Sequence, residues 1–193
     1  MAALIMNHDS PWATKPLGER DIRVADIEVQ DGADAPIRLA LKVISLDSAL
    51  LVQAFVPSHD SKLSYQALSY AWGSREETEE VICDGHAVAV TVNLYAALKR
   101  LREKIGQYGV DPTFWADQIC IDQDSTDEKS QQVAMMGEIF EKGRRVIVWL
   151  GEASEAEGRR LEESLAQRDS LAERREVLLK LSKLEWFGRR WVL

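Results

Sequence analysis

The sequence predicts an α/β fold in which a short parallel sheet with flanking helices follows an N-terminal β extension and includes one hairpin. Three observations predict it. Apolar, β-branched runs alternate with segments of helical periodicity, which is typical of chains that build parallel sheets. Two alternating strand patterns lie before residue 64. The 193 residues, 46% of them hydrophobic, are enough for one domain with a large core and an extension.

The expected extension rests on two strand patterns. Residues 21–29 and 37–46 alternate apolar with polar side chains, as half-buried strands do. The sequence between them, QDGADAP, is rich in residues that form turns. We therefore expect residues 1–64 to form a β extension and residues 65–193 to form the main domain.

The first half of the main domain contains a strand, a hairpin and a helix. Residues 65–70 form a short apolar run. Asp84 and Gly85 lie between two further apolar runs and favour a two-residue hairpin turn. Asn93 is expected to cap a helix that extends to about residue 104, because leucines then recur on one helical face.

The second half repeats the strand–helix order. Residues 114–122 predict a buried strand, and Ser125 with Glu128 forms a capping-box pattern for the next helix. Gly143 is expected to end that helix, and residues 145–150 form a nearly continuous apolar run, as expected for a strand covered on both faces. A helical stretch at 156–184 and a packed segment at 186–193 follow. The residues expected to face inward from the middle helix are Val133, Met136 and Phe140.

Charge and composition exclude several classes of protein. The formal net charge of −8 argues against a nucleic-acid-binding surface, which needs a basic excess. No apolar run approaches the roughly 20 residues of a membrane span, and the N-terminus lacks the pattern of a secretory signal. A cytoplasmic location is therefore expected. The two cysteines and three histidines lack metal-ligand spacing, so no metal site is expected.

Residues with functional chemistry gather where the predicted strands end. In an open parallel sheet, ligands bind beyond the carboxyl ends of the strands. If these strands are neighbours, their ends form one crevice suited to a flat, polar ligand such as a nucleotide. The candidate ligand-binding residues are Tyr70, Trp72, Gly73, Cys120, Asp122, Gln123, Trp149 and Gly151.

Structural roles compete with binding roles at these positions. Trp72 and Trp149 fit core packing as well as a ligand platform, and the glycines can simply turn the chain. Asp122 and Gln123 can cap the following helix or loop. A strand cysteine such as Cys120 is by default an inert core residue.

Two carboxylates are the catalytic candidates. Asp122 ends a predicted strand, whereas Asp117 lies inside it and shares a face with Trp115, Ile119 and Ile121. A buried carboxylate needs a partner, so Asp117 is either an internal hydrogen-bond anchor, which we favour, or a site residue.

Several strings resemble, in order, the motifs of the fungal heterokaryon-incompatibility (HET) domain. The resemblance covers residues 65–193, and a series of motifs in the right order is far more specific than any single string. The strings are YQALSYAWG at 65–73, NLYAAL at 93–98, WADQICIDQ at 115–123, EKSQQVAMM at 128–136, VWLG at 148–151, and WFGRRWVL at 186–193.

The resemblance implies a fungal protein of non-self recognition and programmed cell death, acting by self-association or through other cell-death signalling proteins. HET domains are thought to be similar to TIR domains, which implies a TIR-like, flavodoxin-like topology. Some TIR domains hydrolyse NAD at a glutamate on a late helix, so the alternative is an NAD glycohydrolase that takes NAD or a related nucleotide as substrate. The family's closing motif continues into Gln-Glu, whereas this chain ends at Leu193. The domain is therefore expected to be incomplete and to lack that glutamate.

Overall fold

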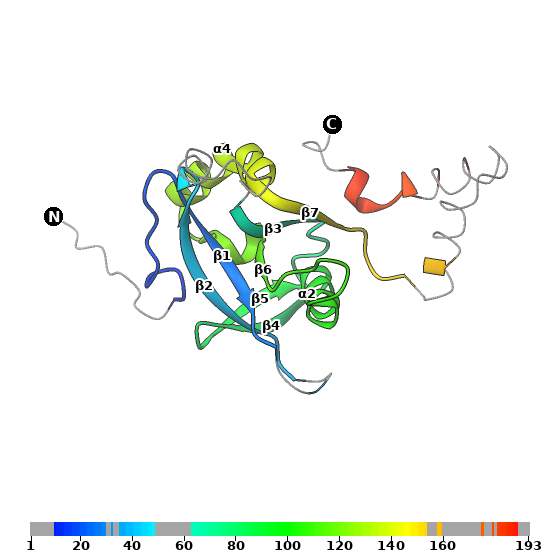
Figure 1. Ribbon diagram of the computed structural model, residues 1–193. Helices are drawn as coiled ribbons and strands as arrows, with labels where there is room; N and C mark the ends of the chain where they lie inside the picture. The colour runs from blue at the N-terminus through cyan, green and yellow to red at the C-terminus, as the bar shows by residue number, and fades with distance from the viewer. Residues whose placement is uncertain are drawn as a thin grey trace.

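One mixed sheet of seven strands, in the order β5-β4-β2-β1-β6-β3-β7, forms the centre of the molecule (Figure 1). The computed structural model describes residues 10–29, 32, 35–48, 63–153, 158–159, 175, 179 and 181–188. The strands are β1 (Asp21–Ile27), β2 (Arg38–Ser45), β3 (Leu63–Tyr70), β4 (Thr78–Cys83), β5 (His86–Thr91), β6 (Thr113–Trp115) and β7 (Gly143–Trp149).

Of the six strand pairs in this sheet, three are parallel and three are antiparallel. β1 runs antiparallel to β2 and β6, and β4 runs antiparallel to β5. The pairs β2–β4, β3–β6 and β3–β7 are parallel. The α/β class is confirmed. The strands expected to form the parallel sheet, β3, β6 and β7, are parallel, but the antiparallel pair β1–β6 joins them to β1 and β2 in one mixed sheet rather than a separate parallel one. A two-residue turn joins the antiparallel strands β4 and β5, whereas a parallel pair needs a long crossover. A TIR-like topology stays a prediction.

β1 and β2 lie in the middle of the sheet rather than in a separate extension. They pair along their whole length, from Asp21 opposite Ser45 to Ile27 opposite Leu39. β1 also pairs with β6, which makes it a central strand, and most of its side chains are buried. The expected strands are therefore present, but they complete the core of the main sheet. The domain boundary at residue 64 stays a prediction.

The predicted hairpin is confirmed. Asp84 and Gly85 connect β4 to β5 with φ angles of +47° and +84°. Two consecutive positive φ angles are the signature of the two-residue turn that fits the twist of a hairpin. The Asp84 carboxylate also accepts a hydrogen bond of 3.2 Å from the Leu41 backbone N–H, which ties the turn to β2.

Helix α2 (Val92–Lys104) begins two residues earlier than expected. Thr91, not Asn93, is the N-cap residue, so the predicted capping role of Asn93 is wrong. The side chain of Asn93 instead contacts the ends of two strands, as described below. The leucines that predicted the inward face are buried, namely Leu94, Leu98 and Leu101.

The strand expected over 114–122 is wrong beyond Trp115. β6 ends there, and the chain turns into the short helix α3 (Asp117–Cys120). Backbone N–H groups of Ile119 and Cys120 donate to the Ala116 carbonyl and close this turn. Asp117 therefore does not share a strand face with its neighbours.

Helix α4 (Thr126–Lys142) begins at the predicted cap, because the Ser125 side chain accepts a hydrogen bond from the Glu128 N–H. Gly143 ends the helix as expected. The predicted inward face is wrong at Val133, which is 54% exposed; the buried residues are Gln132 and Ile139. Gln132 and Ile139, which are seven residues apart, form the buried face of α4, and Met136 and Phe140 beside them are partly buried.

β7 is an edge strand within the described part of the chain, pairing there with β3 alone. Val146 and Val148 are each 43% exposed, so the expectation that both faces of β7 are covered is wrong. The helix expected at 156–184 and the segment at 186–193 lie largely outside the described residues. Inside the described range, η1 (Glu185–Gly188) is a 3-10 helix.

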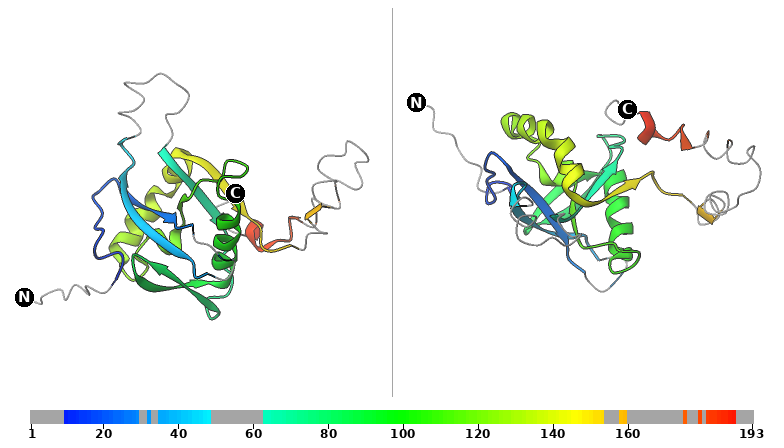
Figure 2. Two further views of the ribbon diagram at one scale, coloured as in Figure 1. Left: turned by 60° about the horizontal axis from the view of Figure 1, so that its bottom comes forward. Right: turned by 45° about the horizontal axis from the view of Figure 1, so that its top comes forward.

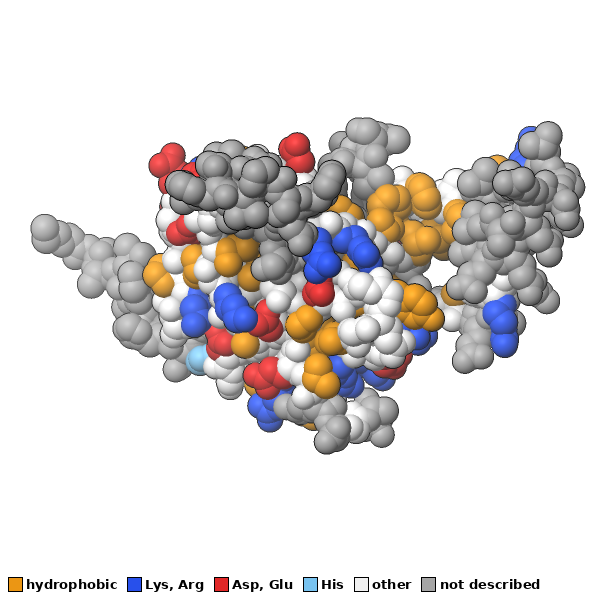
Figure 3. All heavy atoms as spheres, viewed as in Figure 1, with side chains coloured by type: hydrophobic (Ala, Val, Ile, Leu, Met, Phe, Trp, Pro, Cys, Tyr) orange, Lys and Arg blue, Asp and Glu red, His pale blue; other side chains and the backbone are white. Residues whose placement is uncertain are grey.

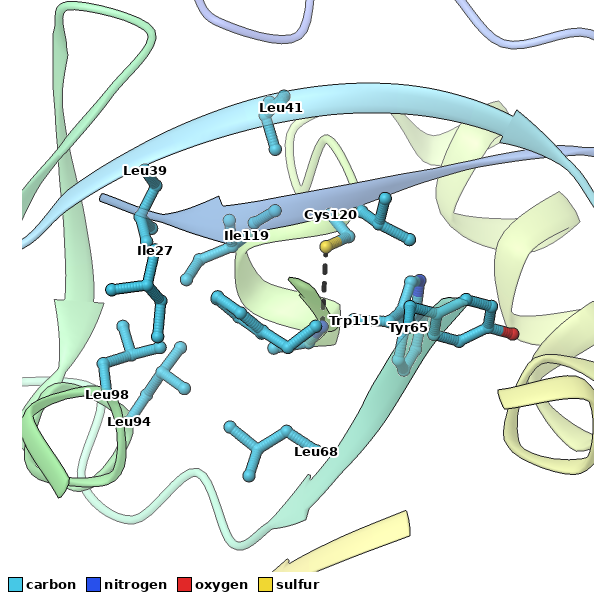
Figure 4. Packing of buried hydrophobic residues seen from close by; sticks show 14 of the residues in the cluster. Ile27, Leu39, Leu41, Tyr65, Leu68, Leu94, Leu98, Trp115, Ile119 and Cys120 are labelled. Atoms are coloured by element: carbon cyan, nitrogen blue, oxygen red, sulfur yellow. Dashed lines mark hydrogen bonds between the residues drawn. The ribbon is translucent and has the colours of Figure 1, made fainter. Parts of the chain in front are cut away.

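The core forms where the central strands meet α2 and α3. Figure 4 shows Trp115 beside Ile119 and Cys120 in the middle of this core. The Trp115 ring also packs edge-on against Phe140 of α4, with ring centroids 5.7 Å apart. α2 contacts β4 and β5, and α4 contacts β3 and β7 (Figure 2). No helix in the described ranges is long and apolar enough to span a bilayer.

Candidate functional site

The carboxyl ends of three neighbouring parallel strands meet at one edge of the sheet. β6, β3 and β7 are adjacent and parallel, so the segments that follow them start from the same edge. This is the arrangement that the sequence predicted, although β6 ends earlier than expected. We call the residues joined there by hydrogen bonds the strand-end cluster: Tyr70, Trp72, Asn93, Asp117, Gln123 and Trp149.

Asp117 is the acceptor at the centre of the strand-end cluster. Its Oδ1 accepts hydrogen bonds from the Tyr70 hydroxyl at 2.7 Å and from the Gln118 backbone N–H at 2.9 Å. Its Oδ2 accepts from Nε1 of Trp72 at 2.9 Å. Burial, together with the nearby Asp117 carboxylate, raises the pKa of Tyr70 well above its usual range, so the hydroxyl remains a donor. This geometry is that of the hydrogen-bond anchor.

Asn93 joins the ends of β3 and β7. Nε1 of Trp149 donates to Asn93 Oδ1 at 2.9 Å, and Asn93 Nδ2 donates to the Ala71 carbonyl at 2.6 Å. Gly73 follows with a φ of +71°, a conformation that favours glycine. Trp149 and Gly73 thus have structural roles, and sequence reasoning missed Asn93 because its partners are distant in the chain.

The remaining predicted residues lie around α3. Gln123 Nε2 donates to the Asp117 carbonyl at 2.7 Å, and the Asp122 carboxylate accepts from the Asp124 N–H at 3.1 Å. Cys120 lies in the core, where burial raises the pKa of its thiol to about 12. A thiol with that pKa is almost entirely protonated at neutral pH and is a poor nucleophile. Gly151 adopts a φ of +105° just after β7.

A buried ion pair between β1 and α4 supports the loop that carries Asp122. Arg23 is 1% exposed, and its Nη2 lies 3.0 Å from Glu128 Oε2. Glu128 Oε1 also accepts from the Asp122 N–H at 2.7 Å, and Arg23 Nε donates to the Lys15 carbonyl at 2.8 Å. The alternating pattern of residues 21–29 places Arg23 among the polar positions of a half-buried strand, so its burial was not expected from the sequence.

Two hollows open beside the strand-end cluster and share Trp72 and Arg75 as lining residues. The larger, of about 1140 Å³, lies between α4 and residues 182–188. The smaller, of about 400 Å³, lies among β5, α3 and residues 10–12. The Arg75 guanidinium stacks over the Trp72 indole, with its central carbon 4.3 Å from the ring centroid. The sequence did not single out Arg75.

The described residues contain no cluster of three or more histidine, cysteine, aspartate or glutamate side chains arranged to hold a metal ion. The one acidic group of the strand-end cluster, the Asp117 carboxylate, is occupied by hydrogen-bond donors of the protein itself. The strand-end cluster therefore presents aromatic rings and amide groups, and the guanidinium of Arg75 stacks on one of these rings.

Comparison with known proteins agrees with the motifs that surround this edge. Residues 65–193 match the family described as heterokaryon incompatibility protein (HET). The chain is 39% identical over 113 residues to "Heterokaryon incompatibility protein 6, OR allele" of Neurospora crassa, an alignment that covers 54% of this chain and 16% of that protein. No solved structure matches. The chain therefore belongs to the heterokaryon incompatibility protein (HET) family.

Proposed function

We propose that this chain is the HET module of a fungal protein of non-self recognition and programmed cell death, and that it signals by self-association or by contact with partner proteins. Family membership over residues 65–193 is the observation that carries this proposal. The Neurospora relative bears the name of a heterokaryon incompatibility protein. Neither description names a nucleotide hydrolase, so the alternative of an NAD glycohydrolase is not favoured.

The roles of the motif residues support a module that works through its surface. Asp117, Gln123 and Glu128 all use their side chains in hydrogen bonds within the domain. Their polar groups therefore stabilise the fold, and a functional contact is expected on the exposed surface. Hydrophobic side chains gather there beside the end of β7 (Figure 3). Val146 and Val148 are exposed on this strand, and an exposed apolar edge strand is suited to protein contact.

The test places a charge on β7 and measures association and cell death. Val148→Asp is expected to lower both the oligomeric fraction in sedimentation and the death of fungal cells that express the protein. Val92→Asp is the matched control, because Val92 has the same exposed fraction of 43% but lies at the start of α2. A strictly monomeric wild type at high concentration, with no partner recovered from cells and no cell death, would contradict the proposal.

A further inference from the structure

We propose that Arg75 and the smaller hollow form a binding site for a small organic anion, such as a phosphate monoester or a carboxylate. The site is independent of the proposed association through β7. Arg75 lies in the loop between β3 and β4, and its guanidinium stacks on Trp72. Both residues line the hollow of about 400 Å³.

The stack holds the guanidinium in place because the indole beneath it is itself fixed. Nε1 of Trp72 donates to Asp117 Oδ2 at 2.9 Å, and the other carboxylate oxygen is held by Tyr70 and by the Gln118 N–H. A guanidinium placed before the ligand arrives loses less conformational entropy when it binds. The donor is therefore pre-organised in the way that anion recognition requires.

The guanidinium is also available to a ligand. Four glutamates follow closely at positions 76, 77, 79 and 80, yet no ion pair within the described part of the chain includes Arg75. The N–H groups of a guanidinium lie in its own plane, where they can donate in pairs to the two oxygens of a carboxylate or phosphate.

Gln118 and Thr91 give the hollow a polar wall. Gln118 is buried, and its amide exchanges hydrogen bonds with the Thr91 hydroxyl and also accepts from the Thr91 N–H. A volume of about 400 Å³ suits a molecule of metabolite size. Asp124 lines the same hollow, and its carboxylate repels an anion held by Arg75. Substitutions of Arg75 and Asp124 must therefore change anion affinity in opposite directions.

Isothermal titration calorimetry of the full chain in low-salt buffer tests the site, with phenyl phosphate and benzoate as probes and benzamide as the uncharged counterpart. Both anions are expected to bind one to one, and benzamide at least about tenfold more weakly. Arg75→Ala should weaken anion binding by about tenfold or more, and Arg75→Lys should weaken it less. Asp124→Asn should tighten it about threefold, because a like charge is removed.

Arg100→Ala is the matched control, because Arg100 is an exposed arginine paired with Glu103 on α2, away from the hollow. It should leave the affinity unchanged. Near-ultraviolet circular dichroism of each variant checks that the fold is intact. Anion binding that survives Arg75→Ala unchanged, or no binding of either anion at millimolar concentration, would overturn the proposal. Preference for phenyl phosphate or for benzoate then identifies which oxyanion the site selects.

Discussion

Replacing Asp117 with asparagine removes the charge from the centre of the strand-end cluster with almost no change in shape. The carboxylate accepts three hydrogen bonds, two at Oδ1 and one at Oδ2. An amide has one oxygen and one NH₂ group. If the oxygen faces Tyr70 and the Gln118 N–H, the NH₂ group faces the indole N–H of Trp72. In the reverse orientation it faces the Gln118 N–H, so at least one N–H loses its acceptor in either case.

The magnitude follows from this geometry. A buried donor left without an acceptor costs about 1–3 kcal/mol. The hydrogen bonds that remain lose their charge assistance, which is worth about half of their strength. Trp72 is only partly buried, so water offsets some of the cost. We therefore expect Asp117→Asn to lower the free energy of unfolding by about 2–4 kcal/mol.

Urea denaturation of the full chain, followed by tryptophan fluorescence, measures this change. The control is Asp122→Asn in the same motif, where the carboxylate accepts from the exposed Asp124 N–H. It should cost less than about 1 kcal/mol. The double variant Tyr70→Phe with Asp117→Asn should cost less than the sum of the single changes, because both changes weaken the same Tyr70–Asp117 hydrogen bond. Equal stability of Asp117→Asn and wild type would refute the role of Asp117 as an anchor.

Two further substitutions and one chemical modification test other parts of the structure. Glu128→Gln leaves the buried Arg23 guanidinium without a counter-charge and should lower the free energy of unfolding by about 3 kcal/mol in urea denaturation. Hydrogen bonds from Arg20 lower the pKa of Glu138 from 4.5 to about 2, so this carboxylate stabilises the fold above pH 4.5 and loses that effect as the pH falls toward 2. Glu138→Gln should therefore reduce thermal stability at pH 7, and its difference from wild type should shrink as the pH falls from 4.5 toward 2, whereas an unchanged difference across this range would contradict the assignment. The buried Cys120 thiol should resist iodoacetamide at pH 8 until the chain unfolds, as mass spectrometry of the modified peptide can show.

Elements with strong local signals could be predicted from the sequence. The hairpin follows from Asp84 and Gly85, and the start of α4 follows from Ser125 with Glu128, because each structure is set by residues next to one another. The prediction of a strand over residues 114–122 is wrong because contacts with distant residues decide the structure there. Its apolar pattern suits a strand, but distant donors hold the Asp117 carboxylate where a helical turn begins.

The candidate site was predicted in its location and not in its details. Three parallel strands do end at a common edge, as their terminal residues indicated. Several connections across that edge join residues 45 or more positions apart, such as Trp72 with Asp117 and Asn93 with Trp149. Pairing over such separations leaves no periodic or spacing signal in the sequence. For the same reason the stacked position of Arg75 could be recognised only in three dimensions.

The structure also changes how substitutions in the HET motifs should be interpreted. Asp117, Gln123 and Glu128 are polar residues of the kind that often perform catalysis, yet each one holds two segments of the chain together. Loss of signalling after changing any of them is therefore expected from loss of stability alone. Evidence for a reactive or binding role must come from residues whose side chains make no hydrogen bonds that hold the fold together. Arg75, which can be removed without breaking a described hydrogen bond, meets that condition and separates ligand recognition from folding.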